Sequence, residues 1–281
     1  MALQVTGLPV GAEVLRIGIP VGMAVMVTVL LYFLRPPVTK NVMLSFTPWI
    51  VTGAAVHALF TIDAYPDWAD PLFEPIAVYF TVFTAAGMVW AYMTTASDIG
   101  GEGFHDAQYV AAAGMGATLV AGGFVLSKGH GADLSRVLPA FGGLLLAFLV
   151  AGVAYVGANY VYSKMVIHTG VLGWLVVFGH SLDAVMTAIA ADLFDLPPLY
   201  DAGAQLYDYA GTLPTAAYLP DGWLIVVVKV LLALVVVALL AGVSTLDVMD
   251  DRDAPVNVAL TLLAAYGLGP GIHILLTLVV F

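Results

Sequence analysis

Long apolar stretches, separated by short polar, proline-rich or glycine-rich segments, repeat along the whole chain. Each stretch has roughly the 18 to 25 residues that an α-helix needs to cross a bilayer core of about 30 Å. The pattern predicts an all-α integral membrane protein with about eight transmembrane helices. The predicted spans are 17–34, 43–62, 72–95, 108–126, 134–155, 166–194, 223–243 and 256–281.

Composition excludes a soluble fold. Of the 281 residues, 62% are hydrophobic and 10% are charged, and the mean hydropathy is +1.01. No globular core of this size buries so much apolar surface. We therefore expect residues 1–281 to form a single polytopic domain in the cell membrane. Residues 1–10 have no positive charge, which argues against a cleaved signal peptide.

Charge and cysteine content narrow the chemistry. The chain has 8 Lys and Arg against 19 Asp and Glu, a formal net charge of −11, and no cysteine. The acidic balance argues against a nucleic-acid partner and against a polybasic membrane anchor. Acidic loops with few lysines suit concentrated salt and predict a halophilic source. Disulfides, thiolate metal sites and cysteine nucleophiles are excluded.

Successive spans cross the membrane in opposite directions, and this predicts which ionisable residues lie near the same side. We call side A the face that carries the connections 63–71 and 195–221. Following each helix by its direction places His57, Asp183, Lys229 and His273 in the half of the membrane next to side A, with His180 in it or adjoining it. Ionisable groups inside a membrane are costly and usually face a bundle interior or a wet cavity. Absolute orientation stays open.

The sixth span carries the main candidate site. His180, Asp183 and Thr187 are spaced three and four residues apart, so they share one helix face. This stripe suits acid–base catalysis by His180 and Asp183, a proton relay, or metal binding. The alternative is a clamp between helices, with Ser181, Ala184 and Ala188 as a small-residue packing edge.

The last span contains Gly267-Leu268-Gly269-Pro270-Gly271, followed by His273. Three glycines and a proline predict a helix broken near mid-membrane, whose second half points toward the polar stripe. A proline kink that serves packing is the alternative.

Three further residues are candidates for supporting roles. Lys229 either extends its ammonium to side A or pairs with Asp183, Asp192 or Asp195. His57 and His273 complete the site or, with His180 and Asp183, bind a divalent metal ion. Nucleotide, haem, zincin and serine-hydrolase motifs are absent. The cofactor therefore stays unknown.

Three segments resemble an archaeal integral-membrane family, catalogued as domain of unknown function sixty-three. They are FTPWIVTGAAVHAL, FGHSLDAVMTAIAADLF and YGLGPGIHILL, in the second, sixth and eighth spans. The resemblance runs from about Pro36 to the end of the chain, and His180-x-x-Asp183 is its most specific part. It implies an archaeal membrane protein and no particular activity. The chain is similar to a divergent member, because the family pattern has arginine where this chain has His57 and His273.

Three classes of function fit these observations. The first is an intramembrane enzyme that acts on a lipid or isoprenoid. The second is a proton-coupled transporter or permease, and the third is a structural or assembly partner. Membrane lipids are the expected surroundings in each case. Substrate and oligomeric state stay open.

Overall fold

The computed structural model describes residues 10–100, 106–129, 133–198, 200–244 and 253–280. The described parts are helical and contain no β-strand. The α-helices are α1 (Val10–Leu34), α2 (Lys40–Leu44), α3 (Thr47–Phe60), α4 (Ala77–Gly100), α5 (Asp106–Lys128), α6 (Leu134–Val161), α7 (Ser163–Phe194), α8 (Asp201–Thr212), α9 (Trp223–Ser244) and α10 (Asp253–Val280), with short 3₁₀ turns η1 (Asp70–Leu72) and η2 (Pro214–Ala217).

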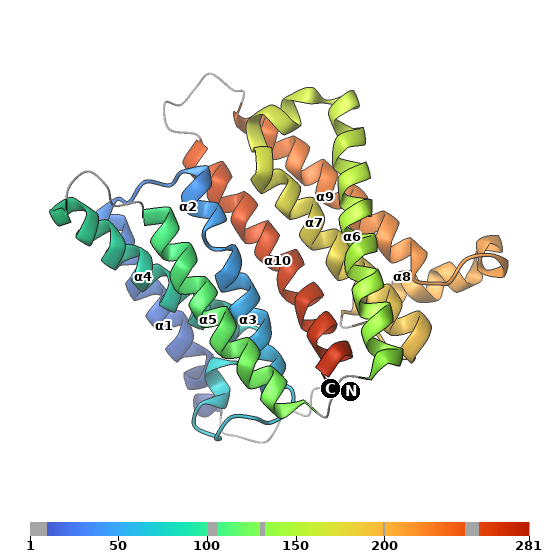
Figure 1. Cartoon of the computed structure of the whole chain (residues 1–281), viewed down its shortest axis with the longest axis horizontal. Coiled ribbons are helices and arrows are strands. Elements are labelled where there is room, and N and C mark those ends of the chain that lie inside the picture. The colour runs from blue at the N-terminus through green and yellow to red at the C-terminus, as the bar shows by residue number, and fades with distance from the viewer. Residues whose placement is uncertain (1–9, 101–105, 130–132, 199, 245–252, 281) are drawn as a thin grey trace.

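Eight segments of the described chain are long and apolar enough to cross a membrane, with α2 and α3 together forming the second. The predicted all-α membrane bundle is therefore confirmed. Figure 1 shows that α1 begins and α10 ends at the same end of the bundle, as an even number of spans requires. This end also carries the connection between α3 and α4, so it is side A.

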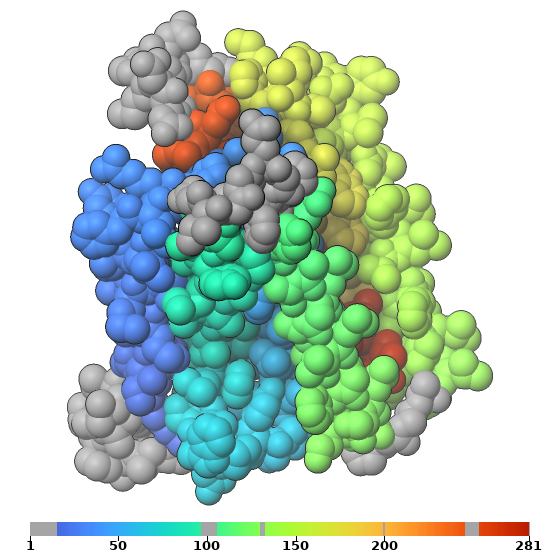
Figure 2. All heavy atoms as spheres, turned by 60° about the vertical axis from the view of Figure 1, so that its left-hand side comes forward, coloured from blue at the N-terminus to red at the C-terminus, as the bar shows by residue number. Residues whose placement is uncertain are grey.

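The spans form two groups with α10 between them. Helices α1, α3, α4 and α5 lie on one side and α6, α7 and α9 on the other (Figure 1). Helix α10 packs against α7 and α3, and so joins the two groups. The end of α10 is visible between α5 and α6 in Figure 2. The junction along α10 is where residues from both groups meet.

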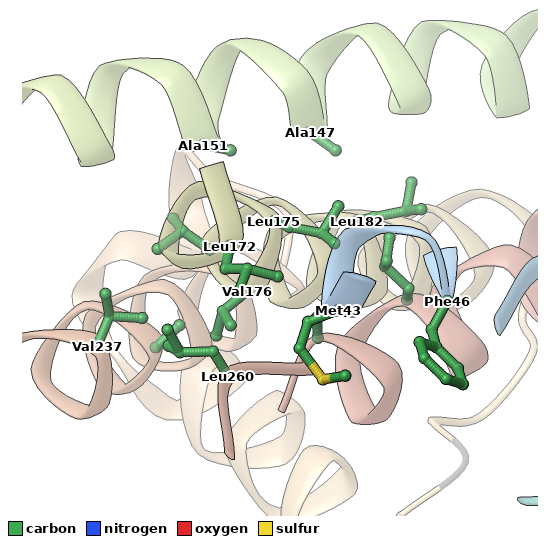
Figure 3. Packing of buried hydrophobic residues seen from close by; sticks show 14 of the residues in the cluster. Met43, Phe46, Ala147, Ala151, Leu172, Leu175, Val176, Leu182, Val237 and Leu260 are labelled. Atoms are coloured by element: carbon green, nitrogen blue, oxygen red, sulfur yellow. The ribbon is translucent and has the colours of Figure 1, made fainter. Parts of the chain in front are cut away.

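Helices α7 and α10 are the most buried of the described spans. Helix α7 contacts α6, α9 and α10, and most of its side chains from Leu172 to Ala191 are buried. Small residues bring α6 close, because the fully buried Ala147 and Ala151 face α7 (Figure 3). Leu172, Val176 and Leu182 of α7 fill the apolar core beneath.

The predicted break in the last span is wrong. Helix α10 runs without interruption from Asp253 to Val280, with Pro270 inside it. Its glycines serve close packing instead. A Cβ atom at Gly267 would lie 2.6 Å from the backbone nitrogen of His180, and one at Gly271 would lie 2.7 Å from that of Asp183. Gly267 and Gly271 thus form a G-x-x-x-G contact with α7.

A break occurs in α7, where none was expected. Gly170 has φ 54° and ψ −135°, and so interrupts the helix near its start. The Tyr155 hydroxyl of α6 donates a hydrogen bond to the Gly170 carbonyl, with an O–O distance of 2.7 Å. Only glycine adopts these angles without strain, and Tyr155 satisfies a carbonyl that the break leaves free.

Several predicted boundaries also change. The span 43–62 divides at Ser45 and Phe46 into α2 and α3, with Pro48 in the first turn of α3. The span 72–95 begins later, at Ala77, after η1. The connection 195–221 contains α8 and η2.

Candidate functional site

An ion pair between α7 and α9 is the centre of the site. Lys229 Nζ lies 2.6 Å from Asp183 Oδ2, and the two side chains are 22% and 4% exposed. At 1.5 Å per residue, Lys229 lies about 9 Å along α9 from Trp223, so the pair lies within the spans. The predicted pairing with an acidic residue is confirmed for Asp183, and the alternative of a lysine extended to side A is wrong.

The other members of the α7 stripe surround this pair. Thr187 Oγ1 lies 3.4 Å from Asp183 Oδ1, the oxygen that does not contact Lys229. His180 is one turn before Asp183, and its ring is 6.1 Å from the ring of Tyr266 on α10. The charges of Asp183 and Lys229 both act on His180. The stripe predicted from helical spacing is therefore arranged around one charge pair.

Three tyrosines from separate elements complete the site. Tyr200, just before α8, lies with its ring 5.9 Å from Lys229 Nζ, a cation–π contact. Tyr79 of α4 places its hydroxyl 3.1 Å from the position that a Cβ atom of Gly269 would take. Tyr79, Tyr200 and Tyr266 are 40%, 44% and 57% exposed, so the site is open on their side. We call Tyr79, His180, Asp183, Tyr200, Lys229 and Tyr266 together the polar centre.

The sequence did not indicate the roles of Tyr79 and Tyr266. By sequence alone, Tyr79 is typical of a core or interfacial aromatic, the usual place of tyrosine in a membrane helix. Tyr200 had a weak signal, because it lies among acids and prolines in the longest connection. The contact of His180 with Tyr266 joins α7 to α10, and the Tyr79 hydroxyl of α4 lies beside Gly269 of α10. Only the tertiary structure brings these helices together.

The Tyr200 hydroxyl stays protonated at neutral pH. Burial raises the pKa of Tyr200 above its usual value, and the nearby negative charges of Tyr79, when ionised, and Asp183 add to this. A neutral tyrosine hydroxyl is both a donor and an acceptor. Asp183, when ionised, is the acceptor-only group in a centre that is otherwise rich in donors.

His57 and His273 form a second cluster. Their rings belong to α3 and α10 and lie 4.8 Å apart between centroids, at an angle of 41°. His57 Nδ1 is 3.0 Å from the carbonyl oxygen of Phe73 in the connection before α4. His273 is 9% exposed, and its Nδ1 is buried without a hydrogen-bond partner. The prediction that both residues lie near the same side is confirmed.

The four candidate metal ligands do not gather in one cluster in the described parts of the chain. Nowhere in these parts of the chain do three or more His, Asp or Glu side chains lie close enough to hold a metal ion. The four predicted ligands divide into two pairs. His57 and His273 meet where α3 packs on α10, whereas Asp183 faces α9 and is neutralised by Lys229.

A network at side A holds the long connection against the bundle. Both carboxylate oxygens of Asp192 accept from the backbone nitrogen of Gly222, at 3.2 and 3.3 Å. Tyr207 of α8 also hydrogen-bonds to Asp192. Burial, this hydrogen bond and the charges of Asp192, Asp221 and Asp195 raise the pKa of Tyr207 to about 12. Asp192 is thus an anchor for α8 and α9, outside the polar centre.

Comparison with known proteins adds no assignment. No protein-family model, no curated protein and no solved structure matches the chain. The resemblance to the archaeal family stays a prediction. The polar centre and the histidine pair are therefore the features that indicate a function.

Proposed function

We propose that the protein is a proton-coupled transporter of the cell membrane, in which Asp183 binds the proton and Lys229 is its charge partner. The observation that carries this proposal is the 2.6 Å ion pair inside the spans. Ionisable residues at such depth are costly, and in membrane proteins they mark proton relays and ion or substrate pathways.

The geometry couples protonation to a change of partner. While Asp183 is ionised, its charge and that of Lys229 cancel. When Asp183 takes up a proton, the Lys229 ammonium loses its counter-ion in a medium where an unpaired charge is unfavourable. The ammonium is the more exposed member, at 22%, and its other contact is the ring of Tyr200. Protonation therefore frees Lys229 to turn toward Tyr200 or toward a substrate.

The position of the polar centre also supports transport. Its residues come from both helix groups, because Tyr79 belongs to α4 while Asp183 and Lys229 belong to α7 and α9. Sites between two halves of a bundle are typical of transporters, which open to one side and then the other by moving one half against the other.

A lipid-modifying enzyme is the second candidate. Tyr79 and Tyr266 are 40% and 57% exposed, so a prenyl or acyl chain outside the bundle has access to the polar centre. His180 and Asp183 are then the acid–base groups. The observation that favours transport is the ion pair itself, because protonation of Asp183 changes the partner of Lys229.

Proton flux in proteoliposomes tests the proposal. Vesicles with a trapped pH-sensitive dye are exposed in turn to gradients of Na⁺, K⁺, Cl⁻, phosphate and short-chain carboxylates. We expect at least one gradient to move protons in the wild-type protein and in Asp208→Asn, an exposed control on α8. Asp183→Asn removes the proton-binding carboxylate and is expected to abolish this flux. Wild-type flux in Asp183→Asn, or no flux in the wild-type protein, contradicts the proposal.

A further inference from the structure

The histidine pair has two nitrogens available for protons. A carbonyl oxygen only accepts hydrogen bonds, so His57 Nδ1, at 3.0 Å from the Phe73 oxygen, carries a hydrogen. The lone pair of neutral His57 is therefore on Nε2. In His273, Nδ1 is buried and unpartnered. A buried polar nitrogen without a partner is unfavourable, and structural histidines usually satisfy it. The arrangement thus resembles a proton-transfer pair more than a packing contact.

The pair lies on the same face of α10 as part of the polar centre. Tyr266, Gly269 and His273 are at positions i, i+3 and i+7, which share one helix face. The Tyr79 hydroxyl is beside Gly269, and His273 follows one turn later, about 6 Å along the axis. Tyr79 lies within reach of the charge of Asp183, and its hydroxyl lies on the face of α10 that also carries His273.

The histidine pair lies near side A. His57 is in the last turn of α3, and the carbonyl that it contacts belongs to the connection between α3 and α4. The connection runs along side A (Figure 1). The histidine pair, which belongs to α3 and α10, therefore lies between this surface and the polar centre.

From this placement we infer that His57 and His273 form a relay that carries protons between water at side A and Asp183. The inference rests on the proposed function. His57 takes a proton from water on Nε2 and passes it to His273, which gives it up toward Tyr79 and Asp183. In each step one bond to hydrogen forms as another breaks, so no further reactant is required.

The groups packed around the pair leave it free for this role. The charged neighbour that acts on His273 is His57 itself. In the connection, Glu74 pairs with Arg16 of α1, and the Tyr65 hydroxyl donates to the Val56 carbonyl. The titratable group that α4 presents to this face of α10 is Tyr79, whose hydroxyl lies beside Gly269. Ala55 and Leu59 of α3, on either side of His57 in the sequence, belong to an apolar cluster with Ala121, Val125 and Val280.

Flux measurements on His57→Gln and His273→Gln test the relay, with His168→Gln at the start of α7 as the matched control. We expect the two relay variants to lower the maximal proton flux by about 100-fold, the scale of a lost proton-transfer group. The apparent affinity for the solute should stay unchanged, and added imidazole should restore part of the rate. Wild-type rates in both variants, with flux lost in Asp183→Asn, overturn the relay and leave the proposed function intact.

A second measurement does not depend on transport. Nitrogen NMR of ¹⁵N-histidine-labelled protein in detergent follows the titration of each ring. A relay requires close coupling of the two rings, so His57→Gln should shift the midpoint of His273, and His273→Gln that of His57, whereas His168→Gln should shift neither. Unchanged midpoints overturn the relay even if no solute drives flux. His57→Asn and His273→Asn repeat both tests if a glutamine variant fails to fold.

Discussion

Lys229 and Asp183 are 46 residues apart in the chain, and their side chains meet at 2.6 Å between α9 and α7. Asp183 is 3% exposed, so its carboxylate has little contact with the surroundings of the bundle. Removal of one partner of a buried pair leaves the other charge uncompensated, and this is far more costly than the loss of an exposed pair.

The first prediction concerns this coupling. Asp183→Ala and Lys229→Ala should each lower the free energy of unfolding by about 3–5 kcal/mol, and the double variant should lose clearly less than the sum. Unfolding of the detergent-solubilised protein by heat or denaturant measures this. The control is Glu74→Ala, which removes a half-exposed pair with Arg16 and should cost about 0–1 kcal/mol. Additive losses in the double variant contradict the prediction.

A second prediction concerns the contact between α7 and α10. Gly267→Ala and Gly271→Ala place a methyl group against backbone atoms of α7, which have no freedom to rotate away. We expect each to lower the free energy of unfolding by about 1–3 kcal/mol through overpacking. Gly122→Ala on α5 has open space around it and should leave stability unchanged or raise it by less than about 1 kcal/mol. Equal effects at all three sites disagree with close packing.

The interruption in α7 leads to a third prediction. A Cβ atom at Gly170 meets nothing within 4 Å, so any cost of Gly170→Ala comes from the backbone angles alone. This cost should be about 1–3 kcal/mol. Tyr155→Phe removes the hydrogen bond to the Gly170 carbonyl and should cost about 1 kcal/mol. Thermal unfolding measures both. The control is Gly157→Ala, which also has open space but lies within the regular helix α6. If Gly157→Ala loses as much stability as Gly170→Ala, backbone strain at Gly170 is not the cause.

A fourth prediction uses the pKa of Tyr207, which is raised to about 12 in the folded protein. An unfolded tyrosine ionises near pH 10, so the unfolded chain releases this proton first as the pH rises. The contribution of the hydroxyl to stability is thus present below pH 10 and is lost between about pH 10 and 12. The stability of the wild-type protein should fall more steeply in this range than that of Tyr207→Phe. Parallel curves for the two proteins contradict this assignment.

The hydrophobic pattern alone determined the class of the protein and the approximate places of its spans. The length of each apolar stretch is sufficient for this, because the thickness of the bilayer sets how many apolar residues a helix needs. Helical spacing also predicted that His180, Asp183 and Thr187 share one face, since this depends only on the geometry of one helix. The same local rules indicated Lys229 as a residue in need of a partner.

The tertiary structure alone decided which residues meet. Tyr79 and Tyr266 look like ordinary membrane aromatics until the packing of α4, α7 and α10 places Tyr266 near His180 and Tyr79 beside Gly269. The glycines of α10 fit a broken helix or a close contact equally well by composition. In the structure these glycines lie against the backbone of α7, so they serve close packing. His57 and His273 separate from Asp183 for the same reason. Contacts between helices depend on the arrangement of the whole bundle, whereas the sequence pattern specifies only the face that each helix presents.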